Sequence, residues 1–462
     1  MFAAETYRKR REKLTEQIQN GILIFLGNHE SPMNYADNCY RFRQDSSFLY
    51  YWGLDNAGFA AAIDIDENRE IIYGNELTLD DVVWMGPQPS LQERCQQVGV
   101  EEIHAFDQLK SHMTKALAQG RKIHFLPQYR PDNIMALAEM LGNAPHKLNE
   151  SASRELIHAV VEQRSVKTPE EIEHIEMALA TAYDMHTYTM RHAQPGVVER
   201  ELAGAIEGIA LAQGGPPSFP IILSVHGETL HNHFHGNRLK TGDLLVCDAG
   251  AESALSYAAD ITRTTPVGGK FSDQQKVIYE IVLTAQQRAI AAIQPGLKFK
   301  EVHLLAAKEI AEGLKQVGIM QGDPDDAVQA GAHALFLPHG LGHMMGLDVH
   351  DMEGLGEDYV GYDQETRRSE QFGLSALRFG KRVQPGYVLT VEPGIYFIPQ
   401  LIDMWRAENK FSEFINYDLV EKHKDFGGIR IEDNIVVTES GCRVLGKPIP
   451  KAVEDVERLA SP

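Results

Sequence analysis

Apolar and polar residues alternate in two ways along the first third of the chain. Short apolar runs with strand character occur at intervals, and between them apolar residues recur every three to four positions, as on one face of a helix. This pattern predicts helices over residues 2–18, 105–118 and 132–141, and strands over residues 22–26, 47–52, 59–64, 70–73 and 123–126. Strands that alternate with helices indicate an α/β domain over roughly the first 160 residues.

A helix start marks the end of this domain. Thr168 suits the capping position, Pro169 suits the first helical position, and Glu171 completes a capping box. We place the boundary just before this helix, which gives domains of residues 1–163 and 164–462. Beyond the boundary the pattern predicts further helices over residues 199–212, 273–293 and 300–317, strands within residues 221–267, and a strand-rich remainder with one helical insertion near residues 416–424.

Composition excludes several classes of partner. The chain of 462 residues carries 44 Lys and Arg against 65 Asp and Glu, a formal net charge of −21. Such a surface repels nucleic acid and anionic lipid. The four cysteines share no C-x-x-C spacing, so neither a zinc finger nor a disulfide framework is predicted. Without a signal-peptide core or a long apolar run, we expect a cytoplasmic protein that binds neither nucleic acid nor membranes.

Three histidines lie close together in the segment 338–351. His339 and His343 are four residues apart, which on a helix would place two metal ligands on one face. Pro338 and three glycines disfavour a regular helix here. An extended or looped backbone directs neighbouring side chains differently, so His339, His343 and His350 are expected to have different roles.

Four carboxylates accompany these histidines on strand-like segments. They are Asp248, Asp260, Glu392 and Glu432. A carboxylate on a buried strand is costly unless it is paired or bound to metal, and each alone could form a salt bridge with an arginine. Together with one imidazole they suit two divalent ions, and oxygen-rich ligation favours Mn²⁺ over a structural zinc. Two such ions would activate a water and polarise a carbonyl, which is hydrolytic chemistry.

The segments that hold these residues resemble a known family. In this order, VCDAG, YAADITRT, PHGLGHMMGLDVHD, LTVEPGIYF and GIRIEDNIVVT are similar to the pita-bread metallopeptidases that cleave Xaa-Pro bonds, namely prolidase and aminopeptidase P. The resemblance covers residues 168–447, and residues 42–48 resemble part of the family's amino-terminal domain. It implies an α/β N-terminal domain like that of creatinase and aminopeptidase P, followed by an α+β pita-bread catalytic domain.

The resemblance also implies roles for individual residues. Asp248 would bind one metal, Asp260 and Glu432 would bridge both, and His343 and Glu392 would bind the second. Glu392 would also carry a proton to the leaving nitrogen. The remaining implied site residues are His339 near the nucleophile, His350 at the tetrahedral intermediate, His231 or its neighbour His233 at the substrate, and Arg430 bracing the metal carboxylates.

Substrate length is the open question within this family. Arg378 matches the prolidase arginine that grips the free carboxylate of a dipeptide, although an arginine in this basic cluster could also be a surface residue. We therefore favour an Xaa-Pro dipeptidase over an aminopeptidase P that acts on longer peptides. A pita-bread module that only binds peptides or proteins is the alternative from another class.

The resemblance extends to cofactors and partners. It implies two divalent ions per subunit, with Mn²⁺ favoured and Co²⁺, Zn²⁺ or Fe²⁺ as alternatives. The implied partners are proline-containing dipeptides or short peptides, together with further copies of the chain in a homodimer or homotetramer.

Overall fold

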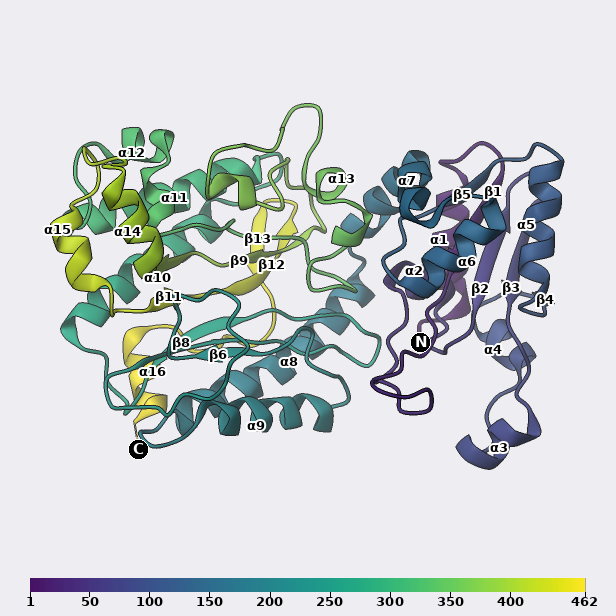
Figure 1. Ribbon diagram of the computed structural model, residues 1–462, viewed down its shortest axis with the longest axis horizontal. Helices are drawn as coiled ribbons and strands as arrows, with labels where there is room; N and C mark the ends of the chain where they lie inside the picture. Colours follow the sequence, from purple (N-terminus) through teal and green to yellow (C-terminus); the bar gives the residue numbers. More distant parts are fainter. Residues whose placement is uncertain (462) are drawn as a thin grey trace. The chain divides into compact units, whose positions relative to one another are not determined.

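The computed structural model describes residues 1–461, which fold into two compact units (Figure 1). The first unit contains Met1–Arg164 together with Gly354–Tyr359. The second contains Ser165–Glu353 and the chain from Val360 onward. None of the described helices combines the length and the apolar composition needed to span a lipid bilayer.

The first unit is built from strands and helices in alternation. Its strands are β1 (Ile22–Leu26), β2 (Ala60–Asp64), β3 (Arg69–Tyr73), β4 (Glu102–His104) and β5 (Ile123–Phe125). Its helices are α1 (Ala4–Thr15), α2 (Ser46–Trp52), α3 (Leu79–Met85), α4 (Leu91–Gln97), α5 (Gln108–Ala118), α6 (Pro131–Leu141), the 3₁₀ helix η1 (Pro145–Ser151) and α7 (Arg154–Ser165). The predicted α/β character of this region is confirmed.

One mixed sheet with strand order β4-β3-β2-β1-β5 forms the centre of this unit. The pairs β1–β2 and β2–β3 are antiparallel, and the edge pairs β3–β4 and β1–β5 are parallel. Alternate residues of β1, such as Ile22 and Ile24, pack in one core cluster with Leu109 and Met113 of α5 and Leu137 of α6. The period of two along the strand thus sends one sheet face to these two helices.

Residues 47–52 are wrongly predicted as a strand, because they form helix α2. The Asp45 side chain accepts a hydrogen bond from the Phe48 amide at 2.8 Å and caps the helix start. Gly53 ends the helix in the left-handed conformation with φ of 63°. The intervening run of aromatic residues is buried in helical form, so its apolar content alone did not distinguish helix from strand.

The elements after α7 begin with two long helices and end with a short one. The helices are α8 (Pro169–His192), α9 (Glu199–Ala212), α10 (Asp273–Ala292), α11 (Phe299–Gln316), α12 (Pro324–Ala330), η2 (Ala332–Leu335), η3 (Glu353–Leu355), α13 (Glu357–Gly361), η4 (Leu374–Ala376), α14 (Pro399–Ala407), α15 (Tyr417–Val420), η5 (Glu421–His423) and α16 (Val453–Ala460). The strands are β6 (Ile222–Ser224), β7 (Leu244–Asp248), β8 (Thr262–Pro266), β9 (Val388–Val391), β10 (Gly394–Tyr396), β11 (Gly428–Arg430), β12 (Asp433–Thr438) and β13 (Gly441–Val444).

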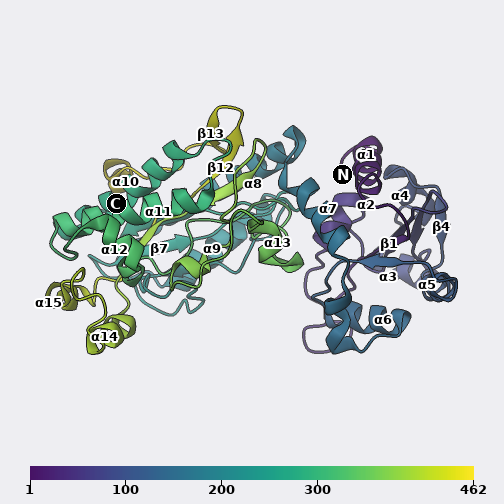
Figure 2. The ribbon, with the colours of Figure 1, turned by 90° about the horizontal axis from the view of Figure 1, so that it is seen from above.

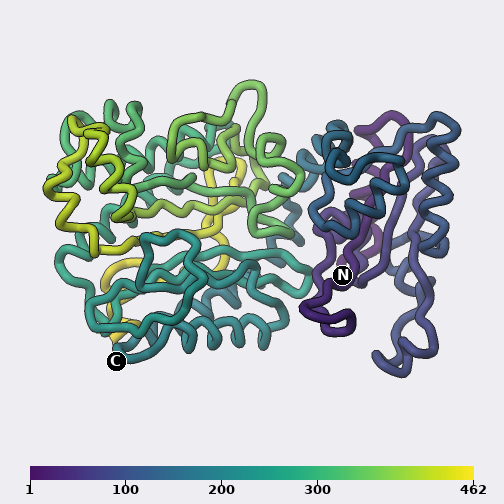
Figure 3. Tube along the Cα trace, viewed as in Figure 1, coloured from purple at the N-terminus to yellow at the C-terminus, as the bar shows by residue number. Residues whose placement is uncertain are grey.

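Three small sheets and the helices around them form the second unit (Figure 2). The sheets have the strand orders β6-β7-β8, β13-β12-β9 and β10-β11. Met185 of α8 and Ile206 of α9 pack with Leu223 and Leu245 of the first sheet in one core cluster. The C-terminal part of the chain, yellow in Figure 3, returns to pair β12 with β9.

Helix starts with local capping signals are where they were predicted. Thr168 caps α8 in a capping box with Glu171, and Ser272 caps α10 in the same way with Gln275. The remainder of the chain holds more helix than predicted, because α14 precedes the insertion near residues 416–424. The helices α3, α4 and α7 are also absent from the prediction.

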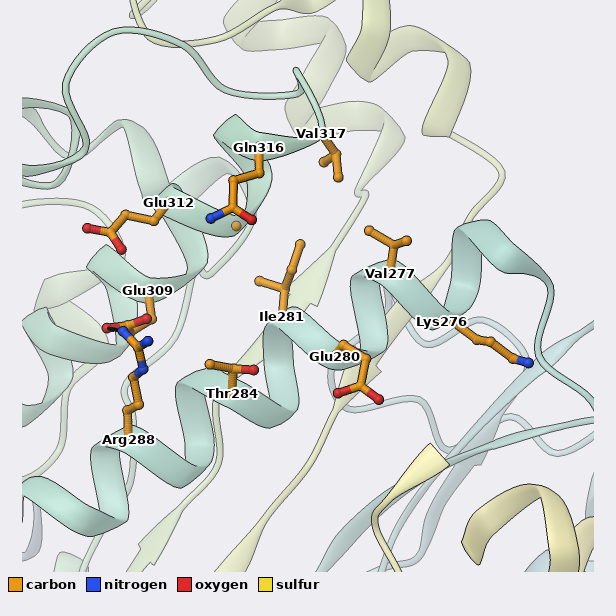
Figure 4. A pocket seen from close by; sticks show the side chains of 11 residues that line it. Lys276, Val277, Glu280, Ile281, Thr284, Arg288, Glu309, Glu312, Gln316 and Val317 are labelled. Carbon is orange, nitrogen blue, oxygen red and sulfur yellow. Dashed lines mark hydrogen bonds and ion pairs between the residues drawn. The ribbon is translucent and has the colours of Figure 1, made fainter. Parts of the chain in front are cut away.

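Helices α10 and α11 lie side by side, and a groove of about 420 Å³ opens between them (Figure 4). Gly313 permits this close approach, because a Cβ atom there would meet the Ile281 side chain at 2.6 Å. The groove lining is aliphatic and ionic, and Arg288 pairs with Glu309 at 2.5 Å across it.

Candidate metal centre

Strand ends bring the four predicted carboxylates together. Asp248 is the last residue of β7, and Asp260 precedes the antiparallel neighbour β8. Glu392 follows β9. Glu432 was predicted inside a strand but lies between β11 and β12. At this point the chain changes its pairing partner from β10 to β9. Its amide donates to Thr262 O at 3.1 Å, which fixes the residue against the edge of β8.

His343 lies among these carboxylates with one nitrogen free for a ligand role. Its Nε2 is 3.4 Å from Asp260 Oδ2 and 3.6 Å from Glu392 Oε1. Its Nδ1–H donates to Met344 O at 3.0 Å, so the Nε2 lone pair faces the acids. The ligand atoms of Asp260, His343 and Glu432 lie within 4.8 Å of one another, and all three residues are buried.

The carboxylate oxygens of this cluster fit divalent cations. Among residues 1–461, Asp248 Oδ1, Asp260 Oδ1 and Glu432 Oε1 are buried without a hydrogen-bond partner. Burial, and then repulsion from neighbouring carboxylates, raises the pKa of Asp260 and of Glu432 well above the ordinary range. Burial also raises the pKa of Glu392 to about 7. Buried acids that repel one another at this spacing are stabilised by bound cations, and one imidazole with four carboxylates suits two such ions.

Arg430 braces the cluster from one side. Its guanidinium donates to Asp248 Oδ2 at 2.6 Å, to the Tyr396 hydroxyl at 2.9 Å and to Thr262 Oγ1 at 3.1 Å. The Thr262 hydroxyl in turn donates to Glu432 Oε2 at 2.6 Å. One arginine therefore orients Asp248 directly and Glu432 through the Thr262 hydroxyl. Thr262 and Tyr396 were not among the predicted site residues, although they lie in the family-like segments YAADITRT and LTVEPGIYF.

The side chain of Asn434 clasps the backbone of Asp260 through two hydrogen bonds. The Asn434 side chain accepts from the Asp260 amide at 3.1 Å and donates to Asp260 O at 2.7 Å. Asn434 is fully buried in β12, so this contact joins the loop before β8 to the sheet that carries Glu392. The sequence offered no signal for it beyond its position two residues after Glu432.

Two more histidines of the segment 338–351 lie around the carboxylates. His339 Nδ1 is 3.9 Å from Glu392 Oε2, and its Nε2 is 2.9 Å from the Tyr396 hydroxyl. The His350 ring centroid is 4.2 Å from that of His343. Burial lowers the pKa of His339 to about 3 and that of His350 to about 4. Both imidazoles are therefore neutral at physiological pH.

Two adjoining cavities open onto the cluster. One of about 260 Å³ is lined by His231, His339, His343, His350, Arg378, Glu392, Arg430, Asp248 and neighbouring backbone. The other, of about 200 Å³, is lined by His231, His233, Asp248, Asp260, His343, His350, Glu392, Glu432 and apolar residues. His231 borders both cavities, whereas His233 borders only the second. A small peptide would meet all the predicted side chains in this space.

Arg378 lies at the wall of the first cavity and is paired. Its Nη1 is 2.5 Å from Glu353 Oε1, and both side chains are about one-third exposed. The other oxygen of Glu353 is 2.6 Å from His350 Nδ1. Glu353, the first residue of η3, was not among the predicted site residues.

Comparisons with known proteins agree with this geometry. Residues 173–439 match the metallopeptidase family M24, and residues 7–124 match the aminopeptidase P N-terminal domain. The human Xaa-Pro dipeptidase is 30% identical over 97% of this chain and 91% of its own length. A probable Xaa-Pro aminopeptidase of Sordaria macrospora is 32% identical over 98% of this chain and 95% of its own length.

Solved structures give the same result for the whole chain. Proline aminopeptidase P II from Yersinia pestis superposes with a TM-score of 0.82 at 27% identity, covering 99% of both chains. The two-domain pita-bread architecture is thereby confirmed, and these relatives give no support to a module that only binds. The chain is an enzyme that belongs to the metallopeptidase family M24.

Proposed function

We propose that this enzyme hydrolyses the peptide bond before proline in dipeptides and short peptides. The observation that carries the proposal is the group of Asp248, Asp260, His343, Glu392 and Glu432, which lines two adjoining cavities. All of these residues except Glu392 are buried, and Asp260, His343 and Glu432 bring their ligand atoms within 4.8 Å of one another. The names of its relatives support the choice of bond, since they act on Xaa-Pro substrates. Proline lacks an N–H and has a fixed φ, so its peptides call for a dedicated site.

The cofactor we propose is a pair of divalent cations, Mn²⁺ in preference to Co²⁺, Zn²⁺ or Fe²⁺, held by those five residues. When bound, such ions lower the pKa of a water and polarise a carbonyl. The preference for manganese follows from four oxygen donors against one nitrogen. Metal analysis of the purified protein, by mass spectrometry after dialysis, tests both the number and the kind of ion.

The remaining side chains have roles that follow from their positions. Glu392 takes a proton from the attacking water and delivers it to the proline nitrogen as the bond breaks. His339, 3.9 Å from Glu392, lies beside that leaving group. His350 and His231 border the space for the scissile carbonyl and orient it. Arg430 keeps Asp248 in place through the 2.6 Å contact.

Dipeptides are the substrates we favour, because Arg378 borders the cavity and offers a guanidinium to a free carboxylate next to proline. Aminopeptidase activity on longer peptides is the second candidate, favoured by the carboxylate of Glu353 on the same guanidinium. Hydrolysis of Ala-Pro, Ala-Pro-Ala and Ala-Ala by the Mn²⁺-loaded enzyme decides the matter. Cleavage of Ala-Ala as fast as of Ala-Pro would refute the proline requirement, and a chelated sample serves as the blank.

We also propose that the enzyme works in the cytoplasm as a homodimer or homotetramer. Its four cysteines are unpaired in the described chain, which fits a reducing compartment. Helix α3 has no buried residue, and Leu79, Val83 and Trp84 are 79%, 70% and 86% exposed, so it offers apolar surface to another copy. Light scattering on the wild type and on Trp84→Ser tests the assembly, and a monomer at micromolar concentration would refute it.

A further inference from the structure

A strained turn carries Glu353 back onto the active site. The Glu353 amide donates to His350 O at 3.2 Å, which closes a tight turn over residues 350–353. Within this turn Met352 has a φ of 63°, although it is neither glycine nor asparagine, and its side chain is buried. A buried non-glycine residue in the left-handed region is held there by its surroundings, and such strain is typical of functional sites.

The turn places one carboxylate between two residues of the site. Glu353 Oε2 is 2.6 Å from His350 Nδ1, and Oε1 is 2.5 Å from Arg378 Nη1. Arg378 therefore faces the cavity with its positive charge opposed by the adjacent carboxylate. A guanidinium offers only donors, and an ionised carboxylate offers only acceptors, so the pair presents both kinds of group.

This pair differs from a bare arginine in what it recognises. The free carboxylate of an Xaa-Pro dipeptide has only acceptors and a negative charge, so Arg378 attracts it while Glu353 repels it. The peptide group that follows proline in a longer substrate is neutral, with a carbonyl for Arg378 and an N–H for Glu353. The pair thus accepts a continuing peptide chain as well as a chain end.

We propose that Glu353 is a specificity-determining residue that opens the site to Xaa-Pro-Yaa peptides by neutralising the carboxylate clamp Arg378. The proposal rests on the function proposed above, because it concerns the same bond and the same cavity. It places the choice between dipeptides and longer peptides in the contact between Glu353 and Arg378.

A first experiment varies the substrate and keeps the wild-type enzyme, loaded with Mn²⁺. Ala-Pro and Ala-prolinamide differ only in whether a carboxylate or a neutral amide follows the proline ring. We expect kcat/KM for the two to agree within about tenfold, since the Arg378–Glu353 pair carries no net charge. A preference for Ala-Pro of about a hundredfold or more would show that Arg378 acts as an unopposed clamp and would overturn the proposal. Failure to cut either compound would instead refute the proposed function.

A second experiment removes the charge of Glu353 and keeps its shape. In Glu353→Gln the amide oxygen can still accept from Arg378, while the repulsion of a substrate carboxylate is lost. We expect the ratio of kcat/KM for Ala-Pro over Ala-Pro-Ala to rise by about tenfold or more, chiefly through a lower KM for Ala-Pro. The matched control is Glu365→Gln, which removes an exposed carboxylate that pairs with Arg382 at 3.0 Å, and its ratio should equal that of the wild type.

A purely structural role of Glu353 predicts something else. If the residue only holds His350 and the turn in place, Glu353→Gln should slow both substrates by the same factor, and the ratio should stay unchanged. That result would overturn the proposal, and the substrate comparison in the wild type gives an independent answer if the variant does not fold.

Discussion

We expect two buried histidines outside the candidate metal centre to make the protein less stable in acid. His303 in α11 and His333 in η2 are fully buried, with ring centroids 6.4 Å apart. Within residues 1–461, none of their four ring nitrogens has a hydrogen-bond partner. Burial lowers the pKa of His303 to about 3 and that of His333 to about 4. Both remain neutral in the folded protein at pH values where the unfolded chain protonates them.

The sign and size of the effect follow from proton linkage. The pKa in the folded state is below the unfolded value of about 6.5, so the stability contributed by the neutral rings is complete above that pH and is lost progressively below it. Between about pH 7.5 and pH 5 each histidine should lower the free energy of unfolding by roughly 2 kcal/mol, and the two together by roughly 4 kcal/mol. The loss continues until the pH reaches the folded-state pKa values of about 3 and about 4.

Replacing both residues, as His303→Leu with His333→Leu, should remove this loss. Because the imidazoles make no hydrogen bond, the double variant should be at least as stable as the wild type near pH 7.5. Near pH 5 it should exceed the wild type by roughly 4 kcal/mol, or roughly 6 °C in Tm for a unit of about 300 residues.

Thermal unfolding of wild type and double variant at both pH values measures this difference. A chelator is present in all samples, since the metal ligands also bind protons. The control is His192→Leu, at an exposed histidine of α8, which should leave the pH dependence unchanged. Equal pH dependence in wild type and double variant would refute the reasoning. A large loss of stability near pH 7.5 would do so as well, because it would mean that the rings are bonded.

Three further perturbations follow from contacts in the second unit. His343→Ala should lower the bound metal by at least about one equivalent, measured by mass spectrometry, because it removes the single nitrogen ligand; full metal content would contradict its role. Arg430→Met should destabilise the metal-free protein by about 3–5 kcal/mol, because it leaves Asp248 buried without a cation, and should destabilise the Mn²⁺-bound protein by less. An equal loss of stability with and without Mn²⁺, measured by calorimetry, would contradict this. Lys167→Met should lower the free energy of unfolding by about 3–5 kcal/mol as well. Lys167 Nζ and Asp351 Oδ2 are 2.8 Å apart and both side chains are 1% exposed, so the variant leaves a buried carboxylate without its cation. Adding Asp351→Asn should restore part of that stability, and no restoration in the double variant would exclude direct pairing.

Structural features that depend only on a few neighbouring residues could be predicted from the sequence. The capping boxes at Thr168 and Ser272 are local, and they mark the starts of α8 and α10. Helix α2 was wrongly predicted, because its aromatic run fits either period and only Asp45 and Gly53 decide between them. Those two residues are common in loops, so their capping role is visible only once the helix is known.

Some candidate site residues can be recognised from the sequence, and others only from the tertiary structure. Carboxylates at the ends of apolar runs stand out, because burial makes an acid expensive there. Glu353 does not stand out, since its position depends on the left-handed backbone at Met352, which has no sequence signature in a non-glycine residue. Asn434 clasps Asp260 across a large sequence separation, and only tertiary structure brings the two together.

The donors of the metal centre come from segments scattered between Asp248 and Glu432, and this constrains when activity can arise. A ribosome-bound chain that has not yet released β12 lacks Glu432 and the Asn434 clasp, so it cannot assemble a complete cage. The complete group of proposed ligands can therefore form only after the second unit has been synthesised as far as Asn434. We expect binding of the proposed ions to follow folding of the second unit, because their ligands lie on separate segments of the chain.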